Sequence, residues 1–297
     1  MVADIGVINT PTGQRSGATN IFRRTGTIWR QEAKILGPVY PQLQPTSAVS
    51  VSGDSVAIGC QNDSNSVANV SVYIRKLSAT GVPFWQKQAQ LKGSATSIRF
   101  GRSVAIDGDT LAAGEESPTK GDVLVFKRTT GIWSQQSKLV PVTPLTANIV
   151  DFGNSVALNG DTILVGTQNL SASKDIKRVY VFQRTISTWS EQALLTDPKN
   201  IGSNGFGFSL DISGDTAAVA DMPLNYGGGG KIGTPGAFDV FKRTGSQWSL
   251  LSRINTKSSE EVFGSGVSIS GNTLMTTRMN IFRPTPRQTE VYRVIAP

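Results

Sequence analysis

The sequence has no histidine and only one cysteine, Cys60, among its 297 residues. The absence of histidine excludes catalytic triads with an imidazole base and metal sites with imidazole ligands. A single cysteine excludes an intramolecular disulfide and a cysteine-based metal site, and its position after the apolar run VAIG indicates a buried side chain. These absences predict a protein that is not an enzyme and that carries no cofactor.

Long apolar runs are also missing. No stretch approaches the ~18 uncharged apolar residues that a membrane-spanning helix needs. The first residues, MVADIGVINTPTGQRSG, lack the basic start and the apolar run of a signal peptide. We therefore expect no membrane span and no signal peptide. Charged residues make up only 17% of the chain, but the net charge of +8 leaves an anionic partner open.

What the sequence does contain is a repeat. Residues 100–115 read FGRSVAIDGDTLAAGE, and similar words return at 152–167, 206–221 and 263–278, with a weaker copy at 45–60. In each copy two apolar runs flank an Asp-Gly, Asn-Gly or Ser-Gly dipeptide, in which glycine accepts positive φ freely. Each copy therefore predicts a tight hairpin of two strands.

A second half-unit follows each hairpin. It consists of a strand that ends in basic residues, a polar turn, a tryptophan and another strand, as in GDVLVFKRTTGIWSQQSKL. All five tryptophans of the chain occupy this place: Trp29, Trp85, Trp133, Trp189 and Trp248. A four-stranded unit that returns every 52–57 residues is typical of β-propeller blades, which stack because one sheet cannot bury both faces alone.

The repeats predict the fold class, an all-β propeller of four-stranded antiparallel blades. The strand count favours six blades, with the first and the last each short of one strand. The alternative is five blades with a terminal extension, in which the last hairpin strand joins the amino-terminal strands. We expect one domain, 1–297, with repeats at approximately 2–44, 45–96, 97–148, 149–202, 203–259 and 260–297.

The words FG…SVAI-x-GDT-x-x-x-G and VYVF-x-R-x-x-x-x-W resemble the FG-GAP repeat of integrin α-chain propellers and bacterial surface proteins. The resemblance implies an extracellular, cell-surface or particle-associated protein. Many integrin-type repeats hold calcium in an Asp-x-Asp-x-Asp-Gly loop, but here the hairpin turns are too short to supply six oxygen ligands. We therefore expect Asp109, Asp161 and Asp215 to brace their turns, and we expect no metal site.

Function is predicted less directly than fold. The favoured interpretation is a non-catalytic binding or assembly module that mediates adhesion or subunit contacts on a cell, a filament or a virus particle. One alternative is a multivalent lectin, in which the repeated tryptophans stack on sugars. A second alternative is a propeller that cleaves glycans with carboxylates at its axis. We expect protein partners or self-assembly, with an anionic glycan or another anionic surface as the alternative, and no nucleic acid.

Candidate ligand-binding residues lie where the copies differ most, in the connections between the second and third strands of each repeat. They are Asn62, Asp63, Asn65, Gln168, Asn169, Asn225, Tyr226 and Lys231. A second candidate is a basic ring at the end of each third strand, formed by Arg23, Arg24, Arg75, Lys76, Lys127, Arg128, Arg184, Lys242 and Arg243. The structural alternative for this ring is that the arginine stems pack over the tryptophan strand.

Three acidic residues depart from the repeat pattern. Asp211 interrupts the apolar alternation of FSLDISGD, and it faces either the channel or a neighbouring blade if that strand forms. Glu115 and Glu116 occupy positions that are neutral in other copies. The favoured interpretation places all three acids on surface loops.

Overall fold

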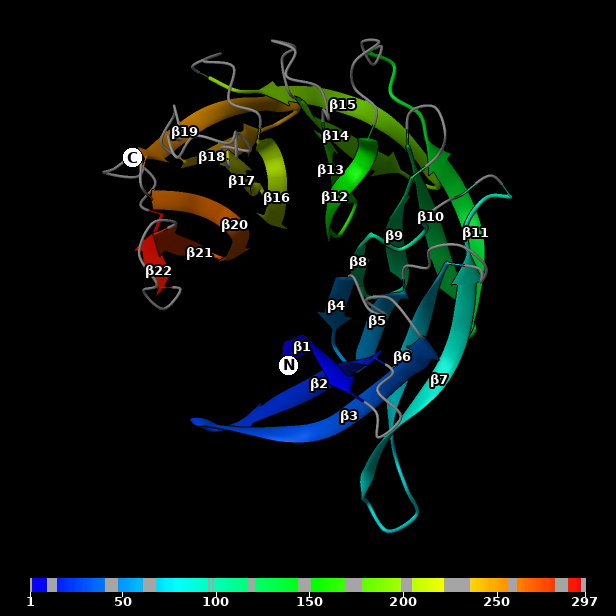
Figure 1. Cartoon of the computed structure of the whole chain (residues 1–297). Coiled ribbons are helices and arrows are strands. Elements are labelled where there is room, and N and C mark those ends of the chain that lie inside the picture. The colour runs from blue at the N-terminus through cyan, green and yellow to red at the C-terminus, as the bar shows by residue number, and fades with distance from the viewer. Residues whose placement is uncertain are drawn as a thin grey trace. The chain divides into compact units, whose positions relative to one another are not determined.

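The computed structural model describes residues 2–9, 15–40, 48–60, 68–95, 97, 99–116, 121–143, 151–168, 178–198, 205–221, 236–255, 261–280 and 288–294. All regular structure in these residues is β-strand (Figure 1). The strands form six sheets, of which four have four strands and two have three. The predicted propeller of four-stranded antiparallel blades is therefore confirmed. The blade number matches the alternative of five blades instead of the favoured six, because neither three-stranded sheet is a complete blade.

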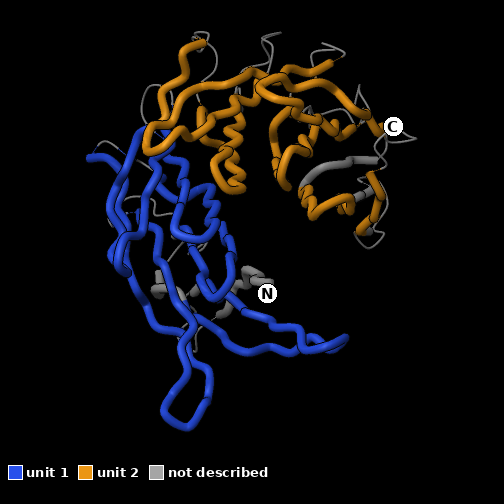
Figure 2. Tube along the Cα trace, turned by 180° about the vertical axis from the view of Figure 1, so that it is seen from behind, with its two compact units in different colours: residues 1–138 blue, residues 139–297 orange. Residues whose placement is uncertain are grey.

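The chain divides into two compact units, residues 1–138 (unit 1) and residues 139–297 (unit 2), which Figure 2 shows in different colours. Unit 1 contains the three-stranded sheet and two complete blades. The strands of the three-stranded sheet, in spatial order, are β1 (Val2–Asn9), β2 (Arg15–Thr25) and β3 (Ile28–Tyr40). The strands of the two blades are β4 (Ala48–Ser52), β5 (Ser55–Cys60), β6 (Asn69–Leu77) and β7 (Pro83–Lys92), then β8 (Ser103–Asp107), β9 (Thr110–Glu115), β10 (Asp122–Thr129) and β11 (Ile132–Leu139).

Unit 2 repeats this arrangement in the opposite order, with two complete blades before its three-stranded sheet. The strands of the blades are β12 (Asp151–Asn159), β13 (Thr162–Gln168), β14 (Arg178–Thr185) and β15 (Thr188–Thr196), then β16 (Phe206–Ser213), β17 (Thr216–Asp221), β18 (Ala237–Thr244) and β19 (Gln247–Asn255). The strands of the last sheet are β20 (Glu261–Ser270), β21 (Thr273–Asn280) and β22 (Gln288–Arg293).

The first hairpin of each repeat closes as the sequence predicts. In the β8–β9 hairpin Asp107 pairs with Thr110, so Gly108 and Asp109 make the turn, and Gly108 has a φ of 54°. The carbonyl of Asp109 accepts a hydrogen bond of 2.8 Å from the backbone N–H of Arg128, at the end of the third strand. This bond connects the turn between the first and second strands to the third strand, and it makes the blade one unit.

The Phe-Gly dipeptide of the repeat joins neighbouring blades. Phe100 is fully buried, and Gly101 has a φ of 84°, a left-handed backbone conformation that favours glycine. A Cβ added to Gly59, in the second strand of the preceding blade, would lie 1.9 Å from the carbonyl oxygen of Gly101. Gly166 and Gly207 make the same approach in unit 2, where the distance would be 2.4 Å. Both glycines of the FG…G pattern are therefore required by close backbone contact between blades.

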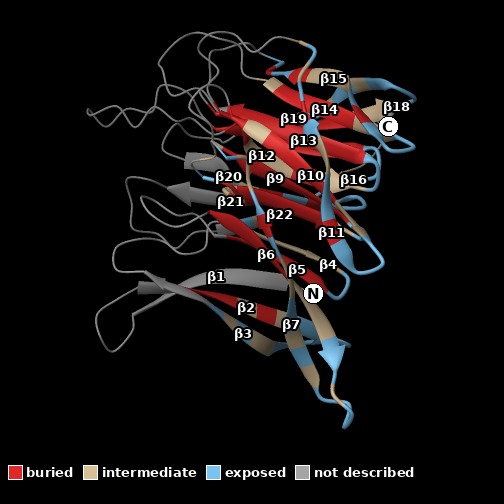
Figure 3. Ribbon diagram, turned by 90° about the vertical axis from the view of Figure 1, so that its right-hand side faces the viewer, coloured by how far each residue is buried: buried red, intermediate tan, exposed pale blue. Residues whose placement is uncertain are grey.

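The core of each unit lies between adjacent sheets (Figure 3). In unit 1, Val70 and Val72 of β6 pack with Leu111 and Leu124 of the following blade. In unit 2, Val179 and Val181 of β14 pack in the same way with residues of β16 and β17. Each blade thus buries its apolar face against the next, which is why the repeat cannot fold as an isolated sheet.

Candidate functional site

The basic residues at the end of the third strand take part in a repeated arginine–aspartate pair. The Nε of Arg128, Arg184 and Arg243 donates to a carboxylate of the hairpin turn in the same blade. The distances to Asp109, Asp161 and Asp215 are 2.6, 2.7 and 2.8 Å. These aspartates thus brace their turns through the arginine of the third strand.

The same arginines cover the tryptophans. The guanidinium carbons of Arg128, Arg184 and Arg243 lie 5.2, 5.2 and 5.3 Å from the ring centres of the tryptophans of their own blades, a cation–π contact. These arginine side chains are only 14–15% exposed. Trp133 and Trp189 are themselves buried beneath them. The arginine stems therefore pack over the tryptophan strand, which is the structural alternative that the sequence offered to a ligand-binding basic ring.

Two of these arginines also reach the preceding blade. Arg128 donates to the hydroxyl of Ser55 at 3.1 Å and to the side-chain carbonyl of Gln88 at 3.2 Å. Arg243 also reaches the preceding blade of unit 2, where it donates to Thr162 of the second strand at 2.9 Å and to Gln183 of the third strand at 2.7 Å. Each arginine therefore connects its own hairpin turn to the blade before it.

The tryptophans use a β-bulge in the fourth strand of the preceding blade. The bulge places Gln88 outside the regular register of β6 and β7, and the indole N–H of Trp133 donates to it at 2.9 Å. Trp248 donates to Gln192 at 3.1 Å, and Trp85 donates to Glu32 at 3.3 Å. Glu32 also receives two bonds from Arg75, and this arginine lowers the pKa of Glu32.

The remaining members of the basic ring lie in more open positions. Lys127 and Lys242 donate to threonine hydroxyls of their own blades at 3.5 and 3.4 Å. Arg23 pairs with Asp54 at 3.6 Å, and Arg24 lies 6.0 Å from the ring centre of Trp29. Lys76 is exposed. Binding of an anionic ligand by the ring stays a prediction.

The predicted ligand residues mostly fall outside the described part of the chain. Gln168 is the last residue of β13 and is paired in register with Asp151. The others, Asn62, Asp63, Asn65, Asn169, Asn225, Tyr226 and Lys231, lie outside the described residues. Their role therefore also stays a prediction.

The three acids singled out in the sequence occupy three different settings. Asp211 of β16 faces the neighbouring sheet, where it accepts hydrogen bonds from the backbone N–H of Ile269 at 2.7 Å and from Ser268 at 2.9 Å, and burial raises its pKa. Glu116 forms an ion pair with Arg99 at 3.0 Å. Glu115 is 1% exposed and accepts the N–H of Ser94 at 2.9 Å. The surface-loop interpretation is therefore wrong for Glu115, which is the buried last residue of β9, and for Asp211, which lies within β16.

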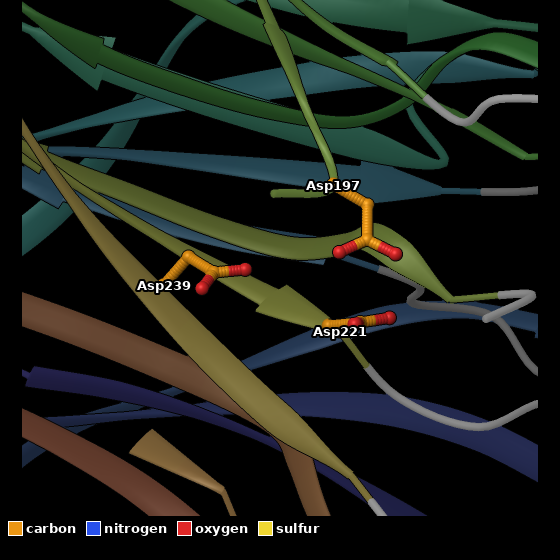
Figure 4. Close-up of side chains that lie close together, drawn as sticks. All are labelled: Asp197, Asp221 and Asp239. Carbon is orange, nitrogen blue, oxygen red and sulfur yellow. The ribbon is translucent and has the colours of Figure 1, made fainter. Parts of the chain in front are cut away.

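A further acidic cluster was missed in the sequence. Asp197 follows β15, Asp221 ends β17, and Asp239 lies in β18 (Figure 4). Their carboxylates surround Arg253 of β19. Nη1 of Arg253 donates to Asp197 and to Asp239 at 2.9 Å each, and Nη2 donates to Asp221 at 2.6 Å. We call these four residues the Arg253 cluster.

The Arg253 cluster is buried and carries more negative than positive charge. The side chains are between 0 and 7% exposed. Burial, together with the negative charges of Asp221 and Asp197, raises the pKa of Asp239 to about 7 against the attraction of Arg253. One oxygen of Asp239 has no hydrogen-bond partner among the described residues. Near neutral pH this carboxyl therefore exchanges a proton, which reduces the excess negative charge.

The geometry of the cluster limits its chemistry. One carboxylate oxygen from each aspartate lies within 4.8 Å of the others, close enough for shared ligation of one cation, but Arg253 already supplies positive charge to all three. Burial of all four side chains leaves no acid open to an external substrate. The sequence signal was a single position, because Asp239 replaces the Tyr180 and Leu124 of other repeats.

Comparison with known proteins agrees with this architecture. A family model described as "FG-GAP repeat" matches residues 133–182, which include Trp133, the strands β12 and β13 and the first part of β14. Residues 133–182 therefore carry an FG-GAP repeat. No curated protein matches the sequence. A crystal structure of a protein from Lactobacillus plantarum is similar to the chain, with a TM-score of 0.52 and 14% identity over 92% of this chain and 74% of the other. At this identity the likeness shows the fold alone.

Glycoside hydrolases also appear among the solved structures that resemble this chain. An exo-β-1,3-galactanase of Phanerochaete chrysosporium matches with a TM-score of 0.45 and 9% identity, over 80% of this chain and 56% of the enzyme. A β-fructofuranosidase of Bombyx mori matches with a TM-score of 0.40 and 12% identity, over 84% and 60%. These matches correct the expectation, drawn from the missing histidine and the single cysteine, that the protein is not an enzyme. Its physical weakness is that carboxylate-based glycoside hydrolysis needs neither histidine nor cysteine.

The described residues contain no helix that could cross a membrane. These residues contain strands and turns, and none of their segments is a helix long and apolar enough to cross a membrane.

Proposed function

We propose that the chain is an assembly module that binds another protein subunit through the face of its first sheet that carries Trp29 and Leu36. This proposal makes the chain a surface-associated component of a cell, a filament or a particle. The observation that carries it is the exposure of Trp29. This side chain is 47% exposed, whereas Trp133 and Trp189 at the same position of other repeats are 9 and 8% exposed.

The register of β2 and β3 defines this face. Arg24 pairs with Trp29 and Ala18 pairs with Leu36, and directly paired residues share one face of a sheet. The opposite face carries Ile21, which packs with Val56 and Ile58 of the following blade. Trp29 and Leu36, 47 and 59% exposed, therefore lie on the face turned away from that blade.

Later blades indicate what this face accepts. In them, the corresponding tryptophan donates its indole N–H to a glutamine or glutamate at the bulge of a preceding strand. A partner that presents an amide or carboxylate beside an apolar strip would satisfy Trp29 in the same way. A second copy of the chain that used a different surface for this contact would make a head-to-tail assembly, either a ring or a filament.

The test is the mass of the purified chain in solution across a concentration series. We expect concentration-dependent oligomers for the natural sequence. The double substitution Trp29→Ala, Leu36→Ser should weaken self-association by about 30-fold, the effect of losing one central aromatic contact. The matched control is Ile186→Ser, because Ile186 is 97% exposed in a turn of another blade.

The assembly proposal fails if the natural chain stays monomeric at every concentration. It also fails if the double variant and the control associate equally. Acrylamide quenching of tryptophan fluorescence gives a further check. If Trp29 is shielded in the monomer, the chain covers this face itself and no partner is required.

A further inference from the structure

The hairpin of β6 and β7 departs from the repeat in the length of its turn. β6 ends at Leu77 and β7 begins at Pro83, so five residues make the turn, whereas β10 and β11 are separated by two. Figure 1 shows this hairpin projecting from the rest of unit 1. The longer turn extends the outer edge of one blade into solvent.

The turn is held by its own hydrogen bonds. The backbone N–H of Ser78 donates to the carbonyl of Val82 at 2.8 Å, and the N–H of Gly81 donates to the carbonyl of Ser78 at 2.9 Å. The hydroxyl of Ser78 accepts the N–H of Val82 at 3.0 Å. The end of the hairpin therefore has a defined shape that its own hydrogen bonds stabilise.

This turn presents apolar side chains on both faces of the hairpin. Leu77 pairs with Pro83 on one face, Phe84 pairs with Lys76 and lies on the other, and Val82 sits in the turn. Leu77, Val82 and Phe84 are 58, 60 and 44% exposed. We call Leu77, Val82, Pro83 and Phe84 the hairpin tip.

The stretch of sequence that contains the hairpin tip is basic. It has no aspartate or glutamate between Asp63 and Asp107, and it contains Arg75, Lys76, Lys87, Lys92, Arg99 and Arg102. Arg75 pairs with Glu32, and Arg99 and Arg102 pair with Glu116, so the charge beside the tip comes from Lys76. Lys76 is exposed next to the tip. The tip therefore combines apolar side chains with a neighbouring lysine, in a stretch of sequence that contains no acidic residue. This combination complements a surface with an apolar interior and a negatively charged outer layer.

We propose that the hairpin tip inserts into the surface of an anionic lipid bilayer. The apolar side chains enter the boundary between headgroups and acyl chains, and Lys76 stays at the level of the anionic headgroups. A protein partner fits the tip less well, because a stable protein interface covers about 800 Å² per partner and a narrow convex tip offers far less. A lipid surface needs no complementary groove and closes around a projection of this kind.

Sedimentation of the full chain with lipid vesicles tests the proposal. We expect binding to vesicles of phosphatidylcholine with phosphatidylserine, and much weaker binding to phosphatidylcholine alone. The double variant Val82→Ser, Phe84→Ser should bind the anionic vesicles at least about tenfold more weakly, because two apolar side chains no longer enter the bilayer. Lys76→Gln should weaken binding by about fivefold and reduce its dependence on salt.

The matched control is the double variant Ile132→Ser, Val142→Ser, which removes two apolar side chains that are 71 and 80% exposed elsewhere. It should bind vesicles as the natural chain does. Equal binding by the tip variant and the control would overturn the proposal and indicate adsorption through net charge. Absence of binding at low salt would also overturn it. If the tip variant changes the oligomer mass instead of vesicle binding, the tip is a protein contact. The tip variants leave Trp29 and Leu36 intact, so this test is independent of the assembly proposal.

Discussion

Arg243 and Arg253 lie on the neighbouring strands β18 and β19 of one blade, yet they occupy opposite electrostatic settings. Arg243 has one carboxylate partner, Asp215, which is 54% exposed, and its other bonds go to neutral side chains. Arg253 has three carboxylate partners, all buried. The first arrangement recurs through the repeat, and the second belongs to this blade among the described residues. The difference shows that the repeat encodes contacts between blades, whereas single departures from it create the unusual chemistry.

The largest effect should follow from removing the positive charge of the Arg253 cluster. Arg253→Met leaves three buried carboxylates without their common partner, and we expect a loss of about 3–5 kcal/mol in the free energy of unfolding. Denaturant titration measures this loss. Arg243→Met is the control, and an equal loss in both variants would contradict the distinction between the two arginines.

A second comparison concerns the tryptophans at equivalent repeat positions. Trp189 is 8% exposed, and Trp189→Ala should cost about 3–4 kcal/mol because it leaves a cavity under Arg184. Trp29 is 47% exposed, and Trp29→Ala should cost less than about 1 kcal/mol in the isolated chain. Thermal unfolding of the two variants checks the difference. Similar losses would show that Trp29 is buried in solution.

The pH dependence of stability sharpens the description of the Arg253 cluster. Burial raises the pKa of Asp239 from 3.8 to about 7, so between these values the folded chain holds a proton that the unfolded chain has lost. The contribution of this group to stability is therefore full below about pH 4 and falls as the pH rises to 7, with a slope of at most about 1.4 kcal/mol per pH unit.

Asp239→Asn should remove this contribution. The difference in unfolding free energy between the variant and the natural chain, measured from pH 4 to pH 8, isolates it from other carboxylates such as Glu32, whose pKa is lowered. A difference that does not change with pH would mean that Asp239 stays ionised throughout.

The smallest effect should come from the repeated arginine. Arg243→Gln loses the ion pair with Asp215 and the cation–π contact with Trp248, at a cost of about 1 kcal/mol, because one partner remains hydrated. Equilibrium unfolding in urea is sensitive enough to detect this. A loss as large as that of Arg253→Met would show that contacts between blades dominate stability.

The sequence predicted the elements that depend on local chemistry. Alternating apolar residues around Asp107-Gly108 were sufficient for a hairpin, because only a few turn types join two strands at that distance. The Phe-Gly pattern predicted the FG-GAP repeat. The structure explains why glycine is needed there, because the backbones of Gly59 and Gly101 approach closely.

The Arg253 cluster was not predictable by the same reasoning. Its members come from three strands and from the residue after β15, and the spacing between Asp197 and Arg253 has no local meaning. Asp239 alone gave a signal, since it occupies an apolar position of the repeat. The bulges that turn Gln88 and Gln192 towards the next blade were also not predictable, because they do not change the alternation of apolar residues in the sequence. Contacts of this kind depend on how blades stack, which a single repeat does not specify.

The contacts of Arg128 have a direction along the chain. Its acceptors Ser55 and Gln88 belong to the preceding blade and are synthesised 73 and 40 residues earlier. Arg243 finds its acceptors Thr162 and Gln183 in the same order, 81 and 60 residues earlier. We therefore expect a newly made blade to find its acceptors already present when it leaves the ribosome. We expect the blades to be added in the order of translation, which protease protection of ribosome-arrested chains of increasing length would reveal as stepwise gains.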